Sequence, residues 1–167
     1  MSRGFVKEDD QEEIPIVPPR ADLPEGVTNY VTQVGMNELL AERKLLENEK
    51  DNVDISDENE NRITLNHINA KLQLLNRRIA EARIVNLKDQ PQNVVKFGAL
   101  ITLKIEATNN IQTFQIVGVD EADISKGKIS FTSPLARLSI NKKIGDKAVL
   151  KRGDGDTVFE ILDIKYC

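Results

Sequence analysis

Apolar residues recur at steps of three and four positions in two stretches of the first half of the chain, which predicts two amphipathic helices. The first is expected to begin after Thr32, a residue type that favours helix N-caps, and to run into the low 50s. Its apolar positions are Met36, Leu39, Leu40, Leu45 and Leu46. The second is expected to end near Ile84 and carries Leu65, Ile68, Leu72, Leu75, Ile79 and Ala82, a spacing typical of a coiled-coil seam.

The stretch between these two runs, DNVDISDENENR at 51–62, is rich in Asp and Asn. These residues compete for backbone hydrogen bonds and favour turns and caps over helix interiors. Because each arm is too short to be stable alone, the two helices must pack on each other. The pattern predicts an antiparallel helical hairpin with an acidic tip near 54–60.

The second half has a different pattern, in which β-branched and aromatic residues partly alternate with polar ones between Gly, Asp, Asn and Pro signals. Strands are predicted at 94–105, 113–119, 128–132, 147–151 and 157–166. RGDGD at 152–156 predicts a hairpin turn, and Ser133 followed by Pro134 predicts the start of a short helix over 134–140. The fold class is therefore α+β: an N-terminal coiled-coil hairpin followed by a small, mainly antiparallel β-sheet domain with one short helix.

The first 27 residues are acidic and interrupted by prolines, and they offer little apolar surface to bury. We interpret residues 1–27 as a flexible extension, 28–87 as the hairpin and 88–167 as the globular domain. A second interpretation keeps part of the extension as an arm that binds a partner, because Ile14, Ile16 and Val17 could dock as a short extended segment.

Charge and composition limit the classes of partner. The formal net charge is -4, from 23 basic and 27 acidic side chains, so the chain as a whole does not attract nucleic acid phosphates. Cys167 is the single cysteine, which excludes an intramolecular disulfide and favours a reducing compartment. No stretch is apolar enough to span a bilayer, and the acidic start does not look like a signal peptide. We therefore expect a cytoplasmic protein without a membrane partner.

Four segments of the second half form a specific pattern: VVKFGALITLK at 94–104, FQIVGVDEAD at 114–123, ISFTSPLARLSINKKIGD at 129–146 and FEILDIKY at 159–166. Together they resemble the C-terminal domain of the GreA/GreB family of transcription elongation factors. The resemblance implies an FKBP-like globular domain that docks on RNA polymerase and a monomeric factor whose hairpin enters the secondary channel of the enzyme. The factor would be no enzyme and would have no cofactor of its own. It would act on the Mg²⁺ of the polymerase active site and meet nascent RNA and template only through that complex.

The resemblance also implies roles for three groups of residues, each of which has a plainer alternative. The tip carboxylates Asp54, Asp57 and Glu58 would assist the polymerase Mg²⁺. The plainer alternative is that they form a solvated acidic turn without a function. On the globular domain, the residues that would dock on RNA polymerase are Asp120, Asp123, Ser133 and Pro134. The plainer alternative is that they are turn and helix-cap residues. The cations of the second arm that would contact RNA or the channel lining are Lys71, Arg77, Arg78 and Arg83. The plainer alternative is that they are ordinary charged residues that flank the seam.

Two departures from the family pattern keep the function open. The tip reads DISDEN, whereas cleavage-stimulating members carry Asp, two further residues and then Glu-Asn. The hairpin is also shorter, as in the Rnk branch of the superfamily, and the loss of roughly two heptads would withdraw the tip by roughly 10 Å. Three functions follow as alternatives: a factor that stimulates cleavage of backtracked RNA, a regulator that occupies the channel without cleavage, and a coiled-coil adaptor that dimerises through the seam.

Overall fold

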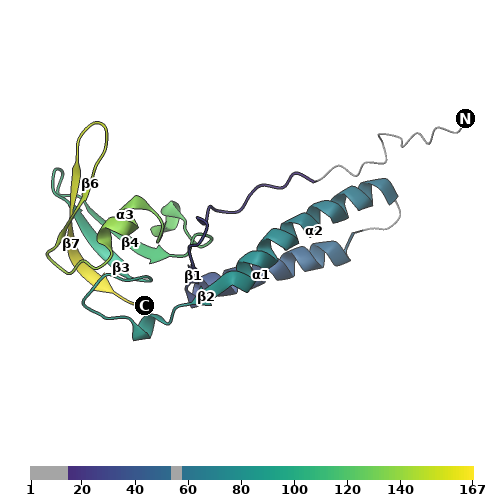
Figure 1. The fold of residues 1–167 in the computed structure, drawn as a ribbon, viewed down its shortest axis with the longest axis horizontal. Coiled ribbons are helices and arrows are strands. Elements are labelled where there is room, and N and C mark those ends of the chain that lie inside the picture. The colour runs from purple at the N-terminus through teal and green to yellow at the C-terminus, as the bar shows by residue number, and fades with distance from the viewer. Residues whose placement is uncertain (1–14, 54–57) are drawn as a thin grey trace, which may run out of the picture.

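The chain folds into a helical hairpin that projects from a small β domain, as the computed structural model in Figure 1 shows. The structure describes residues 15–53 and 58–167. The N-terminal segment runs between the two units, and the C-terminus lies on the globular domain. This arrangement confirms the predicted fold class of a helical hairpin followed by a small β domain with one short α-helix.

The hairpin consists of α1 (Gln33–Asp51) and α2 (Glu58–Glu81). The N-cap of α1 is Thr32, as predicted, and its side chain accepts a hydrogen bond from the Gly35 backbone amide at 2.9 Å. The seam between the helices buries Leu39 and Leu46 of α1 and Ile68, Leu72 and Leu75 of α2. The half-buried Met36, Val53 and Ile79 flank these residues. Leu40 and Leu45, which the periodicity also suggested, are instead exposed on α1.

Two short strands close the base of the hairpin. β1 (Asn29–Val31) precedes α1, β2 (Ala82–Ile84) follows α2, and the two pair in parallel. The second helix therefore ends at Glu81, three residues before the predicted end near Ile84. The helix ends there because Ala82 pairs with Asn29 of β1, 53 positions away in the sequence. Periodicity within the helix cannot reveal such a distant partner.

The globular domain is a five-stranded sheet in the order β5-β4-β3-β7-β6. Its strands are β3 (Leu100–Ile105), β4 (Ile111–Val117), β5 (Lys128–Ser130), β6 (Lys147–Leu150) and β7 (Thr157–Lys165). Every neighbouring pair is antiparallel except β4 and β5, which are parallel. The sheet is thus mixed rather than wholly antiparallel, because the segment 118–127, which contains η3 (Ile124–Lys126), carries the chain back so that β5 runs parallel to the last three residues of β4, starting opposite Gln115.

The remaining elements follow the sequence closely, with one exception. α3 (Pro134–Ser139) has Ser133 as its N-cap and Pro134 in its first turn, and residues 151–156 join β6 and β7 as a hairpin with Gly155 at φ 128°. Residues 94–99 are not a strand, although Val95 and Ala99 are fully buried. Apolar side chains of this segment pack on the sheet from irregular backbone, which follows η2 (Leu87–Asp89).

The buried core of the sheet contains residues of β3, β4, β5 and β7 together with Val95, Ala99 and Ala136, and the half-buried Leu150 of β6 packs against it. Tyr166 anchors the end of the chain to it: its hydroxyl donates to the Val94 carbonyl at 2.5 Å and accepts from the Lys96 amide at 2.8 Å. Burial raises the pKa of this phenol. Within the described ranges, no helix is both long and apolar enough to cross a membrane.

The seam predicts a contrast between two leucines of the hairpin. Leu75 is 0% exposed and Leu45 is 64% exposed. We expect Leu75→Ala to lower the free energy of unfolding by about 2–5 kcal/mol, because it leaves a cavity, and Leu45→Ala to change it by less than about 0.5 kcal/mol. Urea unfolding followed by circular dichroism measures both; equal effects would contradict the seam.

Candidate functional site

The tip of the hairpin is the first predicted site. Asp54 and Asp57 lie outside the described residues. Glu58 is the first residue of α2 and is exposed, as is Glu60, so both carboxylates lie at the positive end of the helix dipole. Within residues 15–53 and 58–167, no three His, Cys, Asp or Glu side chains gather closely enough to hold a metal ion.

The four predicted cations of α2 and β2 fall into two groups. Lys71 is half-buried, whereas Arg77 and Arg83 are exposed. Arg77 pairs with Glu81 one helical turn away at 3.1 Å, and Arg83 donates to the Ala82 carbonyl at 3.3 Å. Arg78 differs from all three, because its side chain is only 13% exposed and faces the interior of the molecule.

Three of the predicted docking residues have defined local roles. Asp123 caps η3 and accepts hydrogen bonds from the Ser125 amide at 3.0 Å and the Ser125 hydroxyl at 2.6 Å, which lower the pKa of its carboxyl group. Ser133 caps α3, and Pro134 is exposed in its first turn. These contacts fit the turn and cap alternative, and docking stays a prediction for this group.

Asp120, the fourth predicted docking residue, joins the globular domain to the hairpin. Its side chain is 8% exposed and lies in a cluster of two cations and two anions, which we call the charged clasp: Arg20, Glu42, Arg78 and Asp120. The four residues come from the N-terminal segment, α1, α2 and the loop after β4. Asp120, predicted to dock on RNA polymerase, and Arg78, predicted to contact RNA or the channel lining, both form ion pairs within the chain, and their roles toward the polymerase stay predictions.

Arg20 makes the closest contacts of the charged clasp. Its Nη1 and Nη2 atoms donate to the two carboxylate oxygens of Glu42 at 2.8 and 3.0 Å, and its Nε donates to Asp120 Oδ1 at 3.0 Å. The fork of the guanidinium thus spans two units of the fold, a geometry that lysine cannot reproduce. The bond to Glu42 raises the pKa of Arg20 further above its ordinary value.

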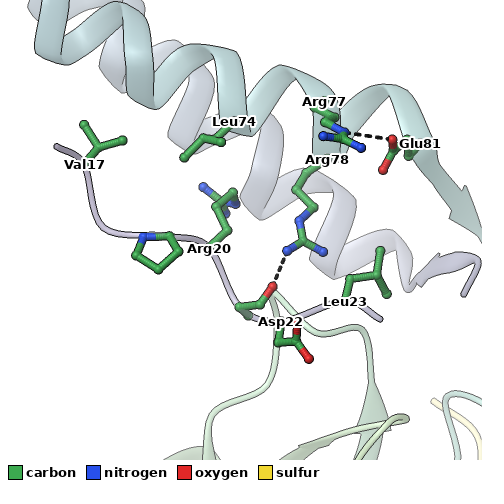
Figure 2. A pocket seen from close by; sticks show the side chains of 10 residues that line it. Val17, Arg20, Asp22, Leu23, Leu74, Arg77, Arg78 and Glu81 are labelled. Carbon is green, nitrogen blue, oxygen red and sulfur yellow. Dashed lines mark hydrogen bonds and ion pairs between the residues drawn. The ribbon is translucent and has the colours of Figure 1, made fainter. Parts of the chain in front are cut away.

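Arg78 completes the charged clasp more loosely. Its Nε lies 3.7 Å from Asp120 Oδ2, too far for a hydrogen bond, and its Nη2 donates to the Ala21 carbonyl. Figure 2 shows Arg20 reaching from the extended segment toward the hairpin and Arg78 reaching back from α2, with Arg77 paired to Glu81 beside it. Residues 15–25, which we call the strap, therefore lie along the hairpin rather than apart from it.

A second junction lies at the start of α1. Glu121 is buried and accepts a hydrogen bond from the Thr32 hydroxyl at 2.5 Å and another from Lys128 Nζ at 3.0 Å. Thr32 is at the same time the N-cap of α1, so the carboxylate is linked directly to the positive end of the helix dipole. A β-carbon on Gly35 would lie 2.7 Å from the Glu121 carboxylate, which shows how closely the helix and the globular domain approach.

The backbone itself approaches the globular domain at β1. A β-carbon on Gly118 would lie 2.6 Å from the Tyr30 carbonyl oxygen, so the close approach requires glycine. The Tyr30 ring packs against Phe97 and Phe131, with ring centroids 5.9 and 5.8 Å away. The base of the hairpin is thereby fixed on the globular domain by backbone, aromatic and charged contacts.

Sequence reasoning missed three residues that these junctions use: Arg20, Glu42 and Glu121. One signal was available for Arg20, which is the only basic residue between Lys7 and Arg43 and follows two prolines. A lone cation in a stiff acidic segment indicates an ion pair elsewhere in the fold. Nothing in the local sequence identifies its partners, because Arg20 and Asp120 are 100 positions apart.

Comparison with known families and proteins adds evidence about the globular domain. Residues 90–166 match the family model "Transcription elongation factor, GreA/GreB, C-term". The chain is 38% identical over 99 residues to transcription elongation factor GreA of Maricaulis maris and 41% identical over 99 residues to that of Pelobacter propionicus. Each match covers 59% of this chain and 63% of the relative, so the chain spans less than two thirds of these relatives' length.

Two solved structures are more distant. GreA factor homolog 1 of Thermus thermophilus is 18% identical with a TM-score of 0.39, and the match covers 83% of this chain and 99% of that protein. The GreA/GreB factor of Nitrosomonas europaea is 19% identical with a TM-score of 0.42, over 89% of this chain and all of that protein.

The close approach at Gly118 predicts a strong effect of one methyl group. We expect Gly118→Ala to displace Tyr30 and to lower the free energy of unfolding by about 1–3 kcal/mol, because the added atom collides with backbone that cannot rotate away. Gly153→Ala is the matched control, since nothing lies within 4 Å of its β-carbon position. Thermal unfolding together with the amide chemical shifts of residues 29–31 measures both variants; an unperturbed Tyr30 in Gly118→Ala would refute the junction.

Proposed function

We propose that this chain, whose C-terminal domain belongs to the GreA/GreB family of transcription elongation factors, binds RNA polymerase and inserts its helical hairpin into the secondary channel of the enzyme. The observation that carries the proposal is the joint presence of a GreA/GreB domain and a projecting arm attached firmly to it. Binding to RNA polymerase would place the protein in the cytoplasm and would make its contact with nascent RNA and template indirect.

In this proposal the globular domain docks and the hairpin acts. Asp123, Ser133 and Pro134 remain candidates for the docking surface, since they lie in the segments that flank β5. Asp120 supports docking indirectly, by holding the hairpin in place through the charged clasp. Of the predicted cations, Lys71, Arg77 and Arg83 lie at or near the surface of α2 and β2, where they would face the channel lining or RNA.

The tip carboxylates would assist cleavage of backtracked RNA by the polymerase. A hard cation such as Mg²⁺ takes carboxylate oxygens as ligands, and a second such ion supports phosphodiester hydrolysis. Asp54, Asp57 and Glu58 are the candidate donors, and the exposure of Glu58 on the first turn of α2 fits this use. The protein alone would hydrolyse nothing, because the active site belongs to its partner.

A second candidate function is a regulator that occupies the channel without stimulating cleavage. The helices of 19 and 24 residues make a short arm, and the DISDEN spacing differs from that of cleaving members. A tip that stops short of the active site would block access to it while contributing no ligand. This candidate shares the polymerase and the docking domain with the first and differs only at the tip.

A transcript-cleavage assay on backtracked complexes of the cognate RNA polymerase tests these candidates. We expect at least one of Asp54→Ala, Asp57→Ala and Glu58→Ala to reduce the rate of cleavage by at least about tenfold while binding to RNA polymerase is unchanged. Mutation of a residue that only hydrogen-bonds a metal ligand already lowers activity by about tenfold or more, so loss of a ligand should cost at least as much. Glu47→Ala, which removes an exposed carboxylate from the side of α1, is the matched control and should retain activity.

Other outcomes of this assay select among the alternatives. Tight binding of the wild-type protein with no stimulated cleavage would support the channel-occupying regulator. No binding to RNA polymerase, together with a dimer in light scattering, would overturn both polymerase functions in favour of the coiled-coil adaptor.

A further inference from the structure

We propose that Arg20 is a positioning residue: through the charged clasp, the strap fixes the angle at which the hairpin leaves the globular domain. This inference rests on the proposed function only where it concerns RNA polymerase. The angle itself is a property of the isolated chain. Residues 1–27 were expected to form a flexible extension; within the strap, Arg20 contacts Glu42 of α1 and Asp120 of the loop after β4, and the Ala21 carbonyl accepts a hydrogen bond from Arg78 of α2.

The first step of the argument is that the junction at the base fixes a point and not a direction. Thr32, Tyr30 and Gly118 all meet near the start of α1. A helix held only at one end can still pivot about that end. A second contact farther along the helix is needed to set its angle.

Arg20 supplies this second contact. Glu42 lies ten residues beyond Thr32, about 15 Å along α1, and the Arg20 fork binds both of its carboxylate oxygens. The same guanidinium donates to Asp120 on the globular domain. One side chain therefore ties the shaft of the hairpin to the loop that also carries Glu121, the partner of Thr32.

Charge balance shows what Arg20 adds to the charged clasp. Within the charged clasp, the hairpin contributes Glu42 and Arg78, and the globular domain contributes Asp120. Removal of Arg20 would leave two carboxylates beside one arginine, whose Nε is 3.7 Å from Asp120. Glu42 and Asp120 would then repel each other across the junction, and the ion pair of Arg78 with Asp120 would be the one attraction of the charged clasp left to oppose that repulsion.

The strap is built to be ordered at low entropic cost. Pro18 and Pro19 directly precede Arg20 and restrict the backbone in the unfolded chain as well as in the folded one. Arg20 is 18% exposed in its side chain, and Arg78 donates to the Ala21 carbonyl beside it. These contacts hold the guanidinium in place between its two acidic partners.

The lever arm makes the angle matter for function. α1 has 19 residues, so the tip lies about 28 Å from the pivot, and a freedom of about 10° would move the tip by about 5 Å. A carboxylate that shares a metal ion tolerates errors of only about 0.2 Å in a fixed site. Fixing the angle would therefore separate productive from unproductive insertion.

Distance measurement on the isolated protein tests the proposal. In a Cys167→Ser background, spin labels at Lys50→Cys on α1 and Gln112→Cys on β4 report the separation of the two units by double electron–electron resonance; both positions are exposed. We expect a single narrow distance peak for the parent and loss of that peak, as a broad distribution, for Arg20→Ala. Arg20→Lys keeps the charge without the fork and should also broaden it, and Glu42→Gln should broaden it less.

Two controls separate positioning from stability. Arg152→Ala removes an exposed arginine from the β6–β7 turn and should leave the distance peak unchanged. Circular dichroism should show the same helix content for Arg20→Ala as for the parent. A narrow, unshifted peak in a folded Arg20→Ala protein would overturn the proposal, as would a broad peak already present in the parent.

The polymerase enters only in a second arm of the experiment. If the proposed function holds, Arg20→Ala should keep the dissociation constant for RNA polymerase, because docking uses the globular domain, while it loses stimulated cleavage or channel blocking. If Arg20→Ala weakened binding to RNA polymerase as much as it weakened stimulated cleavage or channel blocking, the positioning role would be overturned. Absence of binding by the wild-type chain would refute the proposed function and leave the distance result standing.

Discussion

The arrangement of this molecule depends on how closely the backbone of β1 approaches the loop after β4. Gly118 has no side chain, and this allows the Tyr30 carbonyl to come within the space that a β-carbon would fill. The approach brings Glu121 to Thr32, which caps α1 and also donates to that carboxylate. The start of the first helix and the attachment of the hairpin are therefore one structure, and a change in either would alter the other.

The charged clasp adds direction more than stability to this attachment. Buried charges lose hydration, and their mutual attraction often does little more than offset that loss. Their geometric demands are strict, however, because an unpaired buried charge is costly. Arg20, Glu42, Arg78 and Asp120 come from four separate segments, so the ion pairs among them hold these segments in one arrangement, even though Arg78 Nη1 and Asp120 Oδ2 are buried without a hydrogen-bond partner among the described residues.

The two units of the chain carry different parts of the functional argument. The globular domain carries the family relationship, through the match at 90–166, whereas the hairpin carries the chemistry that the tip could perform. A fold does not by itself assign an activity, so the two proposed polymerase functions differ in the position of a few carboxylates and not in the architecture. Arg20 links these two units, because it contacts both the globular domain and the hairpin.

Local patterns in the sequence determined the elements of this protein. Periodicity identified the hairpin and its seam, Thr32 and Ser133 marked the starts of α1 and α3, and RGDGD marked the turn between β6 and β7. These features depend on neighbours within a few residues, which is why they can be read without a structure. The resemblance to GreA/GreB was likewise carried by contiguous motifs and is confirmed by the family match.

The tertiary structure alone decided which residues meet across the chain. It paired β2 with β1, placed β5 parallel to β4 and packed the irregular segment 94–99 into the core. It also turned Asp120 toward Arg20, 100 positions away in the sequence, and Arg78 toward Asp120, 42 positions away. Contacts at such separations depend on how completed elements pack, and no local pattern of charge or hydrophobicity encodes that packing.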